Sequence, residues 1–349
     1  MNAIMNRSYL GKTVFVGTDV HKAKYVVASI CEGEIVKRWT TVADPQTLAF
    51  QLLKYFKGAK IISGYEAGFS GFTLHRVLIS HGIKNKVVHA AGIAVEANNK
   101  VKTDKRDAKK IAEELAAGRL CSIYIPTQEE EQKRSLSRGR EQAVKRRRTI
   151  GNQLKMKLYY LGCDIPKGKK LSESFLKWCE NLDLAHEHKF ALLELIDAWR
   201  QETERIRRFD KELLKQAGQD GLESIYRSAP GIGPVCARTL SNELGDMTRF
   251  DNERQLFCWT GLTPSEYSSG DHVRRGHISR QGSSRIRAVL VEVAWRAIAE
   301  DRDLELYYQR ISARRGGKRA IVAVARKMAG RLRFCLTKGV EWGKMDLAA

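Results

Sequence analysis

Val14-Phe-Val-Gly-Thr-Asp19 is a short run of mainly apolar residues that ends in an acid, and Lys60-Ile-Ile-Ser-Gly-Tyr-Glu66 has the same form. Both runs predict buried strands. Between these two runs, we expect a hairpin beside the first strand, formed by Lys24–Ile30 and Ile35-Val36. A helix is predicted next, over Pro45–Phe56. The chain therefore begins as an antiparallel sheet and then continues through a helical crossover.

Helices and strands alternate from there to residue 117. Gly71–His81 predicts a helix, Lys86–His89 a strand, and Asp104–Ala117 a further helix whose acidic first turn suits the helix dipole. Three strands followed by helix, strand, helix, strand and helix predict an α/β domain, a mixed sheet with helices on its faces. We place this domain at residues 12–127.

The charge of the chain points to a polyanionic partner. The 349 residues include 62 Lys and Arg against 40 Asp and Glu, a formal net charge of +22. Such a surplus favours nucleic acid, because phosphate contacts release counterions. A membrane partner is disfavoured, because no run of about 18 apolar residues occurs and the mean hydropathy is −0.40.

The N-terminus and the cysteines predict the cellular compartment. The first 13 residues lack the apolar run of a signal peptide, so we expect a cytoplasmic protein associated with the bacterial nucleoid. The seven cysteines are scattered and form no Cys-x-x-Cys pair, which fits a reducing compartment and disfavours a zinc or redox site.

Residues 128–217 predict an all-α linker of long polar helices. The run Lys145-Arg146-Arg147-Arg148 lies in the middle, and Pro166-Lys167-Gly168 marks a break. A seam with a seven-residue repeat, interrupted at Glu202, consists of Leu192, Trp199, Ile206 and Leu213, with Leu195 and Phe209 between. The seam either packs within one chain or joins two chains. We favour a dimerisation coiled coil, because the segment is long and resembles a linker.

Residues 218–340 predict a mainly α-helical C-terminal domain. Ala229-Pro-Gly-Ile-Gly-Pro234 has the spacing of a helix-hairpin-helix turn, in which Gly231 and Gly233 let backbone N–H groups approach a phosphate. A plain helix–helix turn is the alternative. Further on, Tyr267-Ser268-Ser269-Gly270 precedes a series of arginines, namely Arg274, Arg275, Arg280, Arg285 and Arg287. A serine in this setting is placed to attack or hold a phosphodiester, although by composition alone the segment is typical of a solvated loop.

Four acids form the strongest chemical pattern. Asp19 and Glu66 end predicted strands, at the sheet edge where sites form in crossover sheets. Asp104 and Asp107 are three residues apart, so a helix projects both from one face. Taken singly, each acid has a plain structural role as a first-turn or turn residue. Together they predict one or two Mg²⁺ ions, because converging carboxylates need cations. Two metals about 4 Å apart clamp both oxygens of a phosphoryl displacement.

Three blocks around these acids resemble the acidic blocks of insertion-sequence transposases with an N-terminal RuvC-like domain and a D-E-D-D tetrad. They are Thr18-Asp19-Val-His-Lys22, Gly64-Tyr-Glu66-Ala-Gly68 and Lys102-Thr-Asp104-Lys-Arg-Asp107-Ala108. In addition, the run from Gly261-Leu-Thr-Pro264 to Ser279 resembles the second signature of this family, in which a serine just before a glycine is the nucleophile. The resemblance extends from about residue 14 to residue 339.

This resemblance implies a ribonuclease H fold, Mg²⁺ bound by Asp19, Glu66, Asp104 and Asp107, and Ser269 as the nucleophile, with Ser268 the residue most easily confused with it. It implies DNA strands cut and rejoined through a phosphoserine bond, and a composite site with acids from one protomer and the serine from another. His21 and Lys22 either lie near the scissile phosphate or begin a hairpin.

The resemblance also implies partners. It implies a homodimer or tetramer, and a guide RNA from the element that pairs with DNA. The basic residues between 133 and 157 and the arginine-rich C-terminal helices are then the expected RNA and DNA surface. Two alternatives stay open. One is a Mg²⁺-dependent structure-selective nuclease similar to a Holliday-junction resolvase, with Ser269 idle. The other is a non-catalytic nucleic-acid-binding protein.

Overall fold

The structure is a computed structural model that describes residues 8–93, 104–165, 170–269, 272 and 274–347. The residues named above at 102–103, 166–168, 270 and 273 lie outside the described part. The chain divides into two compact units, residues 1–126 and 127–349. Among the described residues, every helix is too short or too polar to cross a membrane.

The first unit is built on a five-stranded sheet. Its strands are β1 (Thr13–Val20), β2 (Lys24–Cys31), β3 (Glu34–Val42), β4 (Lys60–Glu66) and β5 (Lys84–Val88). The strand order is β3-β2-β1-β4-β5. β1 and β3 are antiparallel to β2, whereas β1, β4 and β5 run parallel. This confirms the predicted mixed sheet and is consistent with a ribonuclease H-like domain.

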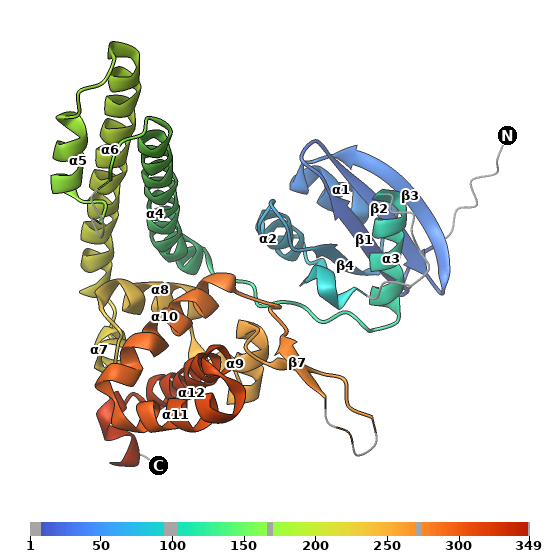
Figure 1. Ribbon diagram of the computed structural model, residues 1–349. Coiled ribbons are helices and arrows are strands. Elements are labelled where there is room, and N and C mark those ends of the chain that lie inside the picture. The colour runs from blue at the N-terminus through green and yellow to red at the C-terminus, as the bar shows by residue number, and fades with distance from the viewer. Residues whose placement is uncertain (1–7, 94–103, 166–169, 270–271, 273, 348–349) are drawn as a thin grey trace. The chain divides into compact units, whose positions relative to one another are not determined.

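Both faces of the sheet are covered by helices (Figure 1). Val14 and Val16 of β1 face a core formed with α1 (Pro45–Tyr55) and α2 (Thr73–Ser80). Phe15 points the other way, into a core with α3 (Asp104–Ala116). Because successive strand residues alternate between faces, Gly17 and Asp19 also lie on the face that α3 covers.

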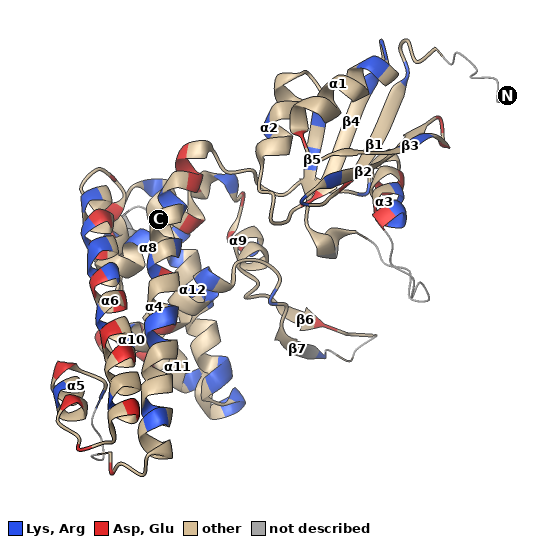
Figure 2. Ribbon diagram, turned by 90° about the horizontal axis from the view of Figure 1, so that it is seen from above, with Lys and Arg blue, Asp and Glu red and all other residues tan. Residues whose placement is uncertain are grey.

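The second unit begins with a long helical hairpin. α4 (Gln128–Tyr160) and α6 (His186–Ala217) lie side by side in both views, and the short α5 (Glu173–Glu180) packs on α6 (Figures 1 and 2). Thr127 caps α4, because its hydroxyl accepts the N–H of Glu130 while the Glu130 carboxylate accepts the N–H of Thr127. This cap fixes where the hairpin starts.

Three of the residues predicted to form a dimer seam on α6 pack within this one chain, and the predicted coiled-coil dimer stays a prediction. Leu192, Ile206 and Leu213 are all at least 95% buried within this one chain, so they are not available to a partner. The interrupting residue, Glu202, is also buried, and its carboxylate accepts hydrogen bonds from Arg146 of α4 and Arg205 of α6. The seam packs inside the hairpin because α4 supplies both the apolar surface and the counter-charge.

The remaining helices of the second unit share one core. They are α7 (Glu223–Ser228), α8 (Pro234–Leu244), α9 (Glu253–Thr260), α10 (Ser284–Glu300), α11 (Arg302–Arg315) and α12 (Gly317–Lys338), with short 3-10 turns η2 (Met247–Arg249) and η3 (Trp342–Leu347). α4 and α6 both contact α8, so the boundary predicted at 217/218 falls inside one compact unit.

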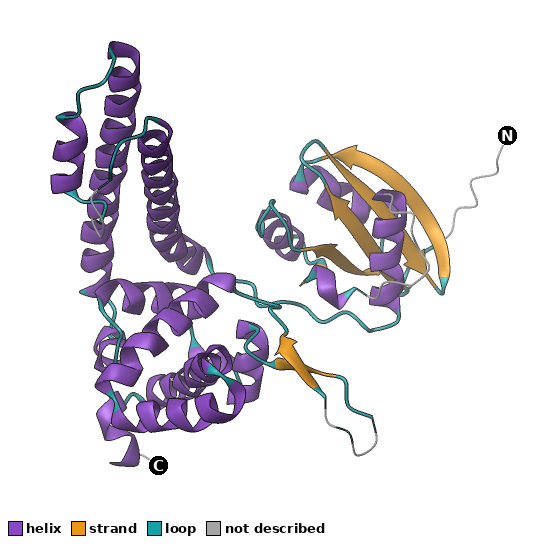
Figure 3. Cartoon of the chain, viewed as in Figure 1, coloured by secondary structure: helices purple, strands orange, loops and turns teal. Residues whose placement is uncertain are grey.

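A two-stranded hairpin extends from these helices (Figure 3). It consists of β6 (Pro264–Glu266) and β7 (Arg275–Ile278), which are antiparallel. The hairpin carries the serine pair at its tip.

Candidate functional site

The two strand-end acids lie at matching positions on neighbouring parallel strands. Thr18 of β1 is paired in register with Tyr65 of β4, so Asp19 and Glu66 follow side by side. Gly64 also faces α3, because a side chain there would meet Leu115. Asp19 and Glu66, two residues beyond glycines on this face, therefore project toward the side of the sheet that α3 covers.

Gly17 brings the third and fourth acids to the same place. A Cβ atom on Gly17 would overlap the carbonyl oxygen of Ala108 and would lie 2.5 Å from the amide nitrogen of Ala112. The backbones of α3 and β1 therefore touch. Because α3 begins at Asp104, this contact holds its acidic first turn beside the end of β1.

A histidine and a lysine complete the cluster. His21 Nε2 lies 3.0 Å from Asp19 Oδ2 and 3.2 Å from Asp104 Oδ2, and Lys24 Nζ lies 3.2 Å from the same Asp104 oxygen. His21 therefore lies in the acidic site. Sequence reasoning missed Lys24, although its position at the start of the second predicted strand, five residues after Asp19, was an available signal.

The electrostatics of the cluster favour a cation. Burial raises the pKa of Asp19, and the nearby Asp107 and Asp104 carboxylates add to this rise, while His21 opposes it. The hydrogen bond from Lys24 lowers the pKa of Asp104, with a further contribution from His21. Asp19 thus bears a desolvation and repulsion cost that a positive ion would relieve.

The donor set fits a divalent cation. The ligand atoms of Asp19, His21 and Asp104 all lie within 4.8 Å of one another. Carboxylate oxygens are the usual ligands of Mg²⁺ and Mn²⁺, and an imidazole is compatible with Mn²⁺. Asp107 is near enough to affect Asp19, whereas Glu66 lies at the adjacent strand end and is exposed. Of the four predicted acids, Asp19 and Asp104 approach each other most clearly.

The hairpin tip distinguishes the two serines. Ser268 Oγ donates to Glu266 Oε1 at 2.8 Å and accepts the N–H of Arg274 at 3.2 Å. Ser269 exchanges backbone hydrogen bonds with His272, is exposed, and its hydroxyl has no hydrogen bond within the described residues. Within the described residues, the Ser268 hydroxyl is engaged in hydrogen bonds and the Ser269 hydroxyl is not.

Some arginines near the hairpin contact other parts of the chain, whereas others form no ion pair among the described residues. Arg285 pairs with Glu141, and Arg287 donates to the carbonyls of Thr260 and Gly282. Arg274 and Arg280 are exposed and form no side-chain ion pair among the described residues. Arg275 lies in β7, and its side chain is outside the described part.

The predicted helix-hairpin-helix turn connects α7 to α8, and one of its N–H groups is already engaged. Gly231 has φ +72°, and a Cβ there would lie 2.7 Å from the carbonyl oxygen of Val293. Its N–H donates to Glu300 Oε2 at 2.7 Å. Gly233 is the N-cap of α8. A phosphate at Gly231 would have to displace the Glu300 carboxylate.

The basic run of α4 also separates into two kinds of residue. Lys145 pairs with Glu141, and Arg146 pairs with the buried Glu202. Arg147 lies with its guanidinium carbon 5.5 Å from the centre of the Trp199 ring. Arg148 is exposed and forms no ion pair among the described residues.

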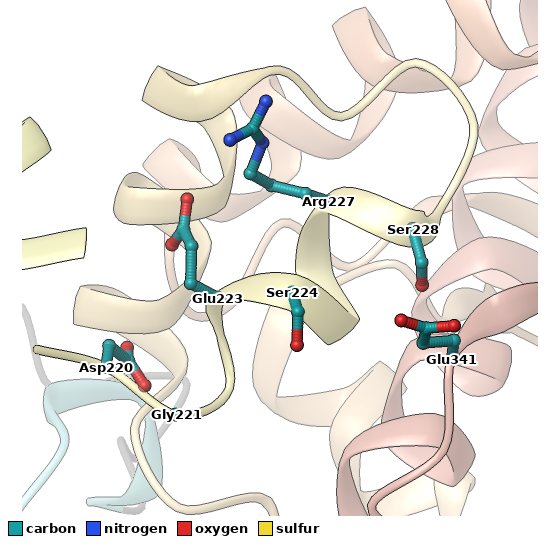
Figure 4. A pocket seen from close by; sticks show the side chains of 7 residues that line it. All are labelled: Asp220, Gly221, Glu223, Ser224, Arg227, Ser228 and Glu341. Atoms are coloured by element: carbon teal, nitrogen blue, oxygen red, sulfur yellow. The ribbon is translucent and has the colours of Figure 1, made fainter. Parts of the chain in front are cut away.

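An acidic cavity in the second unit has a structural explanation. It is lined by Asp220, Gly221, Glu223, Ser224, Arg227, Ser228 and Glu341 (Figure 4). Asp220 and Glu223 both pair with the guanidinium of Arg238, which is 1% exposed. These two acids neutralise a buried charge of the core.

Comparison with known proteins finds one group of relatives. Residues 16–160 match the family DEDD_Tnp_IS110, described as "Transposase", and residues 223–309 match the family described as "Transposase IS116/IS110/IS902 family". A protein of Sinorhizobium fredii named "Putative transposase y4qE" is 30% identical over 289 residues, covering 81% of this chain and 72% of the relative. The transposase for insertion sequence element IS1533 of Leptospira borgpetersenii is 28% identical, covering 92% and 95% of the two chains.

Proposed function

Because the chain belongs to the IS116/IS110/IS902 family of insertion-sequence transposases, we propose that it cuts and rejoins DNA strands at the ends of an insertion element. The observation that carries this proposal is the convergence of Asp19 and Asp104 beside His21, on a sheet edge whose topology suits phosphoryl transfer. The net charge of +22 supports a nucleic-acid substrate.

The acidic cluster would hold Mg²⁺ through Asp19 and Asp104, with Glu66 and Asp107 at its border. Bound there, Mg²⁺ would supply Lewis-acid polarisation of the scissile phosphate. Lys24 pairs with Asp104, and His21 Nε2 lies 3.2 Å from the same carboxylate, so both side chains would be able to contact a phosphate oxygen that enters the site.

Ser269 is the proposed nucleophile. Its Oγ attacks the phosphorus, a P–Oγ bond forms, and the bond from phosphorus to one deoxyribose oxygen breaks. The serine proton leaves to a base, and the departing sugar oxygen takes up a proton. Arg274 and Arg280, exposed on either side of β7, are suited to stabilise the added negative charge. The phosphoserine bond retains the energy of the phosphodiester, so rejoining needs no ATP.

The proposed partners are element-end and target DNA, together with a guide RNA encoded by the element. Base pairing with the RNA would read sequence, while the basic helices of the second unit hold the backbone. Figure 2 places many of the Lys and Arg residues along α4, α6 and α12. Dimers or tetramers would form through surfaces other than Leu192, Ile206 and Leu213 of α6, which are buried within the chain.

A denaturing gel tests this function. The protein is incubated with Mg²⁺, labelled element-end DNA and the RNA transcribed from its flank. We expect a labelled band of protein linked to DNA that is absent with Ser269→Ala. DNA cleavage with free ends that persists in Ser269→Ala would instead identify a hydrolytic nuclease. Absence of any Mg²⁺-dependent cleavage would contradict both enzymatic functions.

A further inference from the structure

A cavity of about 340 Å³ opens between α4 and α6 of the second unit. Arg147, Arg148, Asn152 and Lys155 line it from α4, and Trp199 lines it from α6. All of these residues belong to the second unit. The volume is at the lower end of the range for small-molecule sites and suits a ligand the size of one nucleotide.

Gly151 of α4 also lines the cavity. A Cβ on Gly151 would lie 2.6 Å from Leu171 Cδ2 and 3.6 Å from Trp199 Nε1. The glycine thus makes room for Leu171, and the partly buried indole ring of Trp199 lies beside it at ordinary contact distance. The Trp199 N–H has no hydrogen-bond partner within the described residues. The ring therefore presents an apolar surface and a free donor to the cavity.

The positive charges of the cavity differ from those on the rest of α4. Five other basic side chains of this helix are neutralised by acids: Lys133 by Glu129, Arg138 by Glu243, Arg140 by Asp210, Lys145 by Glu141 and Arg146 by Glu202. Arg147, Arg148 and Lys155 form no ion pair with any described acid. Among the described residues, Arg134 and Lys157 of α4 also have no acidic partner, but neither lines the cavity, and Arg134 donates to backbone carbonyls. Three of the five α4 cations without an acidic partner therefore gather beside Trp199, which favours an anionic ligand.

We propose that this cavity binds one unpaired nucleotide of a single-stranded nucleic acid. Arg148 and Lys155 hold its phosphate, and its base lies against Trp199 beside the guanidinium of Arg147, which already lies over that ring. The volume matches one nucleotide rather than a pair of nucleotides, so we expect the site to take an unpaired residue. The inference rests on the proposed function only for the class of ligand, because binding here needs neither the acids nor Ser269.

Fluorescence anisotropy with labelled oligonucleotides of about 12 residues tests the site, a length within the usual range for single-strand binders. Oligouridine, oligothymidine and a DNA duplex are titrated into the full chain in EDTA, so that catalysis does not contribute. The test variant is Arg148→Ala/Lys155→Ala. The control is Lys54→Ala/Lys57→Ala, which removes two exposed charges of the first unit, outside the cavity and outside the basic helices of the second unit.

We expect the test variant to weaken single-strand binding about tenfold and to lower the slope of log affinity against log salt by about 1. The control should change affinity less than about twofold. Whichever single strand binds more tightly, and loses more in the test variant, identifies RNA or DNA as the ligand. Equal losses in the two double variants would overturn the proposal, because they would indicate only diffuse charge.

Trp199→Phe tests the position of the base and keeps an aromatic ring in the hairpin core. Binding of oligouridine should quench tryptophan fluorescence in the wild type, and most of this quenching should vanish in Trp199→Phe. Undiminished quenching would contradict contact between the base and this ring. Ser269→Ala should bind all strands as the wild type does, which separates failure of this site from failure of the proposed reaction.

Discussion

The backbone of Gly17 in β1 lies directly against the carbonyl oxygen of Ala108 in α3, closer than any side chain at position 17 would permit. This contact sets the distance between the sheet and the helix that begins with Asp104. We expect Gly17→Ala to push α3 outward, lower the free energy of unfolding by about 1–3 kcal/mol and weaken Mn²⁺ binding. Urea unfolding and Mn²⁺ titration by electron paramagnetic resonance measure both effects.

Gly92→Ala is the matched control for this substitution. It lies in the same unit, and a Cβ there meets nothing within 4 Å. It should leave both stability and Mn²⁺ affinity unchanged within error. Wild-type Mn²⁺ affinity in Gly17→Ala would mean that close packing of α3 does not position the acidic site.

Substitutions of Lys24 and Asp104 should change the affinity for a metal ion in opposite directions. Lys24 Nζ shares Asp104 Oδ2 with His21, so it competes with any cation for that carboxylate. Lys24→Ala should therefore tighten Mn²⁺ binding by about threefold to tenfold, whereas Asp104→Asn should weaken it more than about tenfold. Calorimetric titration measures the two affinities. Weaker metal binding in Lys24→Ala would show that the lysine organises the site rather than competing for it.

The two neighbouring serines predict opposite results. Ser268→Ala removes the hydrogen bonds to Glu266 and Arg274 that stabilise the hairpin tip, which should cost about 1 kcal/mol. It should retain the covalent protein–DNA product. Ser269→Ala should abolish that product and leave stability unchanged, because its hydroxyl has no hydrogen bond within the described residues. Loss of the product in Ser268→Ala alone would transfer the nucleophile to that residue.

Much of the first unit was predictable because its signals are local. The β-branched runs ending at Asp19 and Glu66, with predicted helices between strands, indicated the mixed sheet before any contact was known. His21 and Lys24 meet Asp104 because α3 packs closely on Gly17 of β1. Position 17 must be glycine because the backbone of α3 leaves no room for a side chain there. A contact between distant elements leaves no periodic trace in the sequence.

The helical hairpin illustrates the opposite case. The seven-residue repeat at Leu192, Ile206 and Leu213 correctly marked buried positions. It did not identify the partner, because an apolar stripe packs equally well on another chain or on α4. The interruption at Glu202 was the informative residue, since its counter-charge, Arg146, lies in the same chain. Likewise, the Lys145–Arg148 run predicted a positively charged helix surface. It did not reveal that Lys145 and Arg146 are paired with acids of the same chain.

Mixing of inactive subunits tests the composite site that the family resemblance implies. Asp104→Ala removes the acidic cluster of one chain, and Ser269→Ala removes the nucleophile of the other. If one active site takes acids and serine from different protomers, a mixture should recover roughly a quarter to a half of wild-type covalent product in the gel assay, by random assortment of the two chains. Each variant alone should be inactive. No recovery in the mixture would place both parts in one chain.

Asp220 and Arg238 predict how stability depends on pH in the second unit. Burial acts to raise the pKa of Asp220, but hydrogen bonds from Ser241, from the N–H of Leu222 and from Arg238 outweigh it, so the pKa is lowered overall. A lowered pKa in the folded state gives stability that is present above the ordinary aspartate value near 3.8 and is lost as the pH falls through the folded value. Acid should therefore weaken this network.

Asp220→Asn should consequently lower the free energy of unfolding by about 1–3 kcal/mol at pH 7, because Arg238 is 1% exposed and keeps only Glu223 as its acidic partner. The difference from wild type should shrink as the pH falls below about 4, where the wild-type carboxyl also becomes neutral. Urea unfolding followed by circular dichroism at several pH values measures it. Glu341→Gln, in the same cavity but paired among the described residues only with the exposed Lys344, should change stability by less than about 0.5 kcal/mol. A pH-independent difference for Asp220→Asn would mean that the carboxylate charge does not stabilise Arg238.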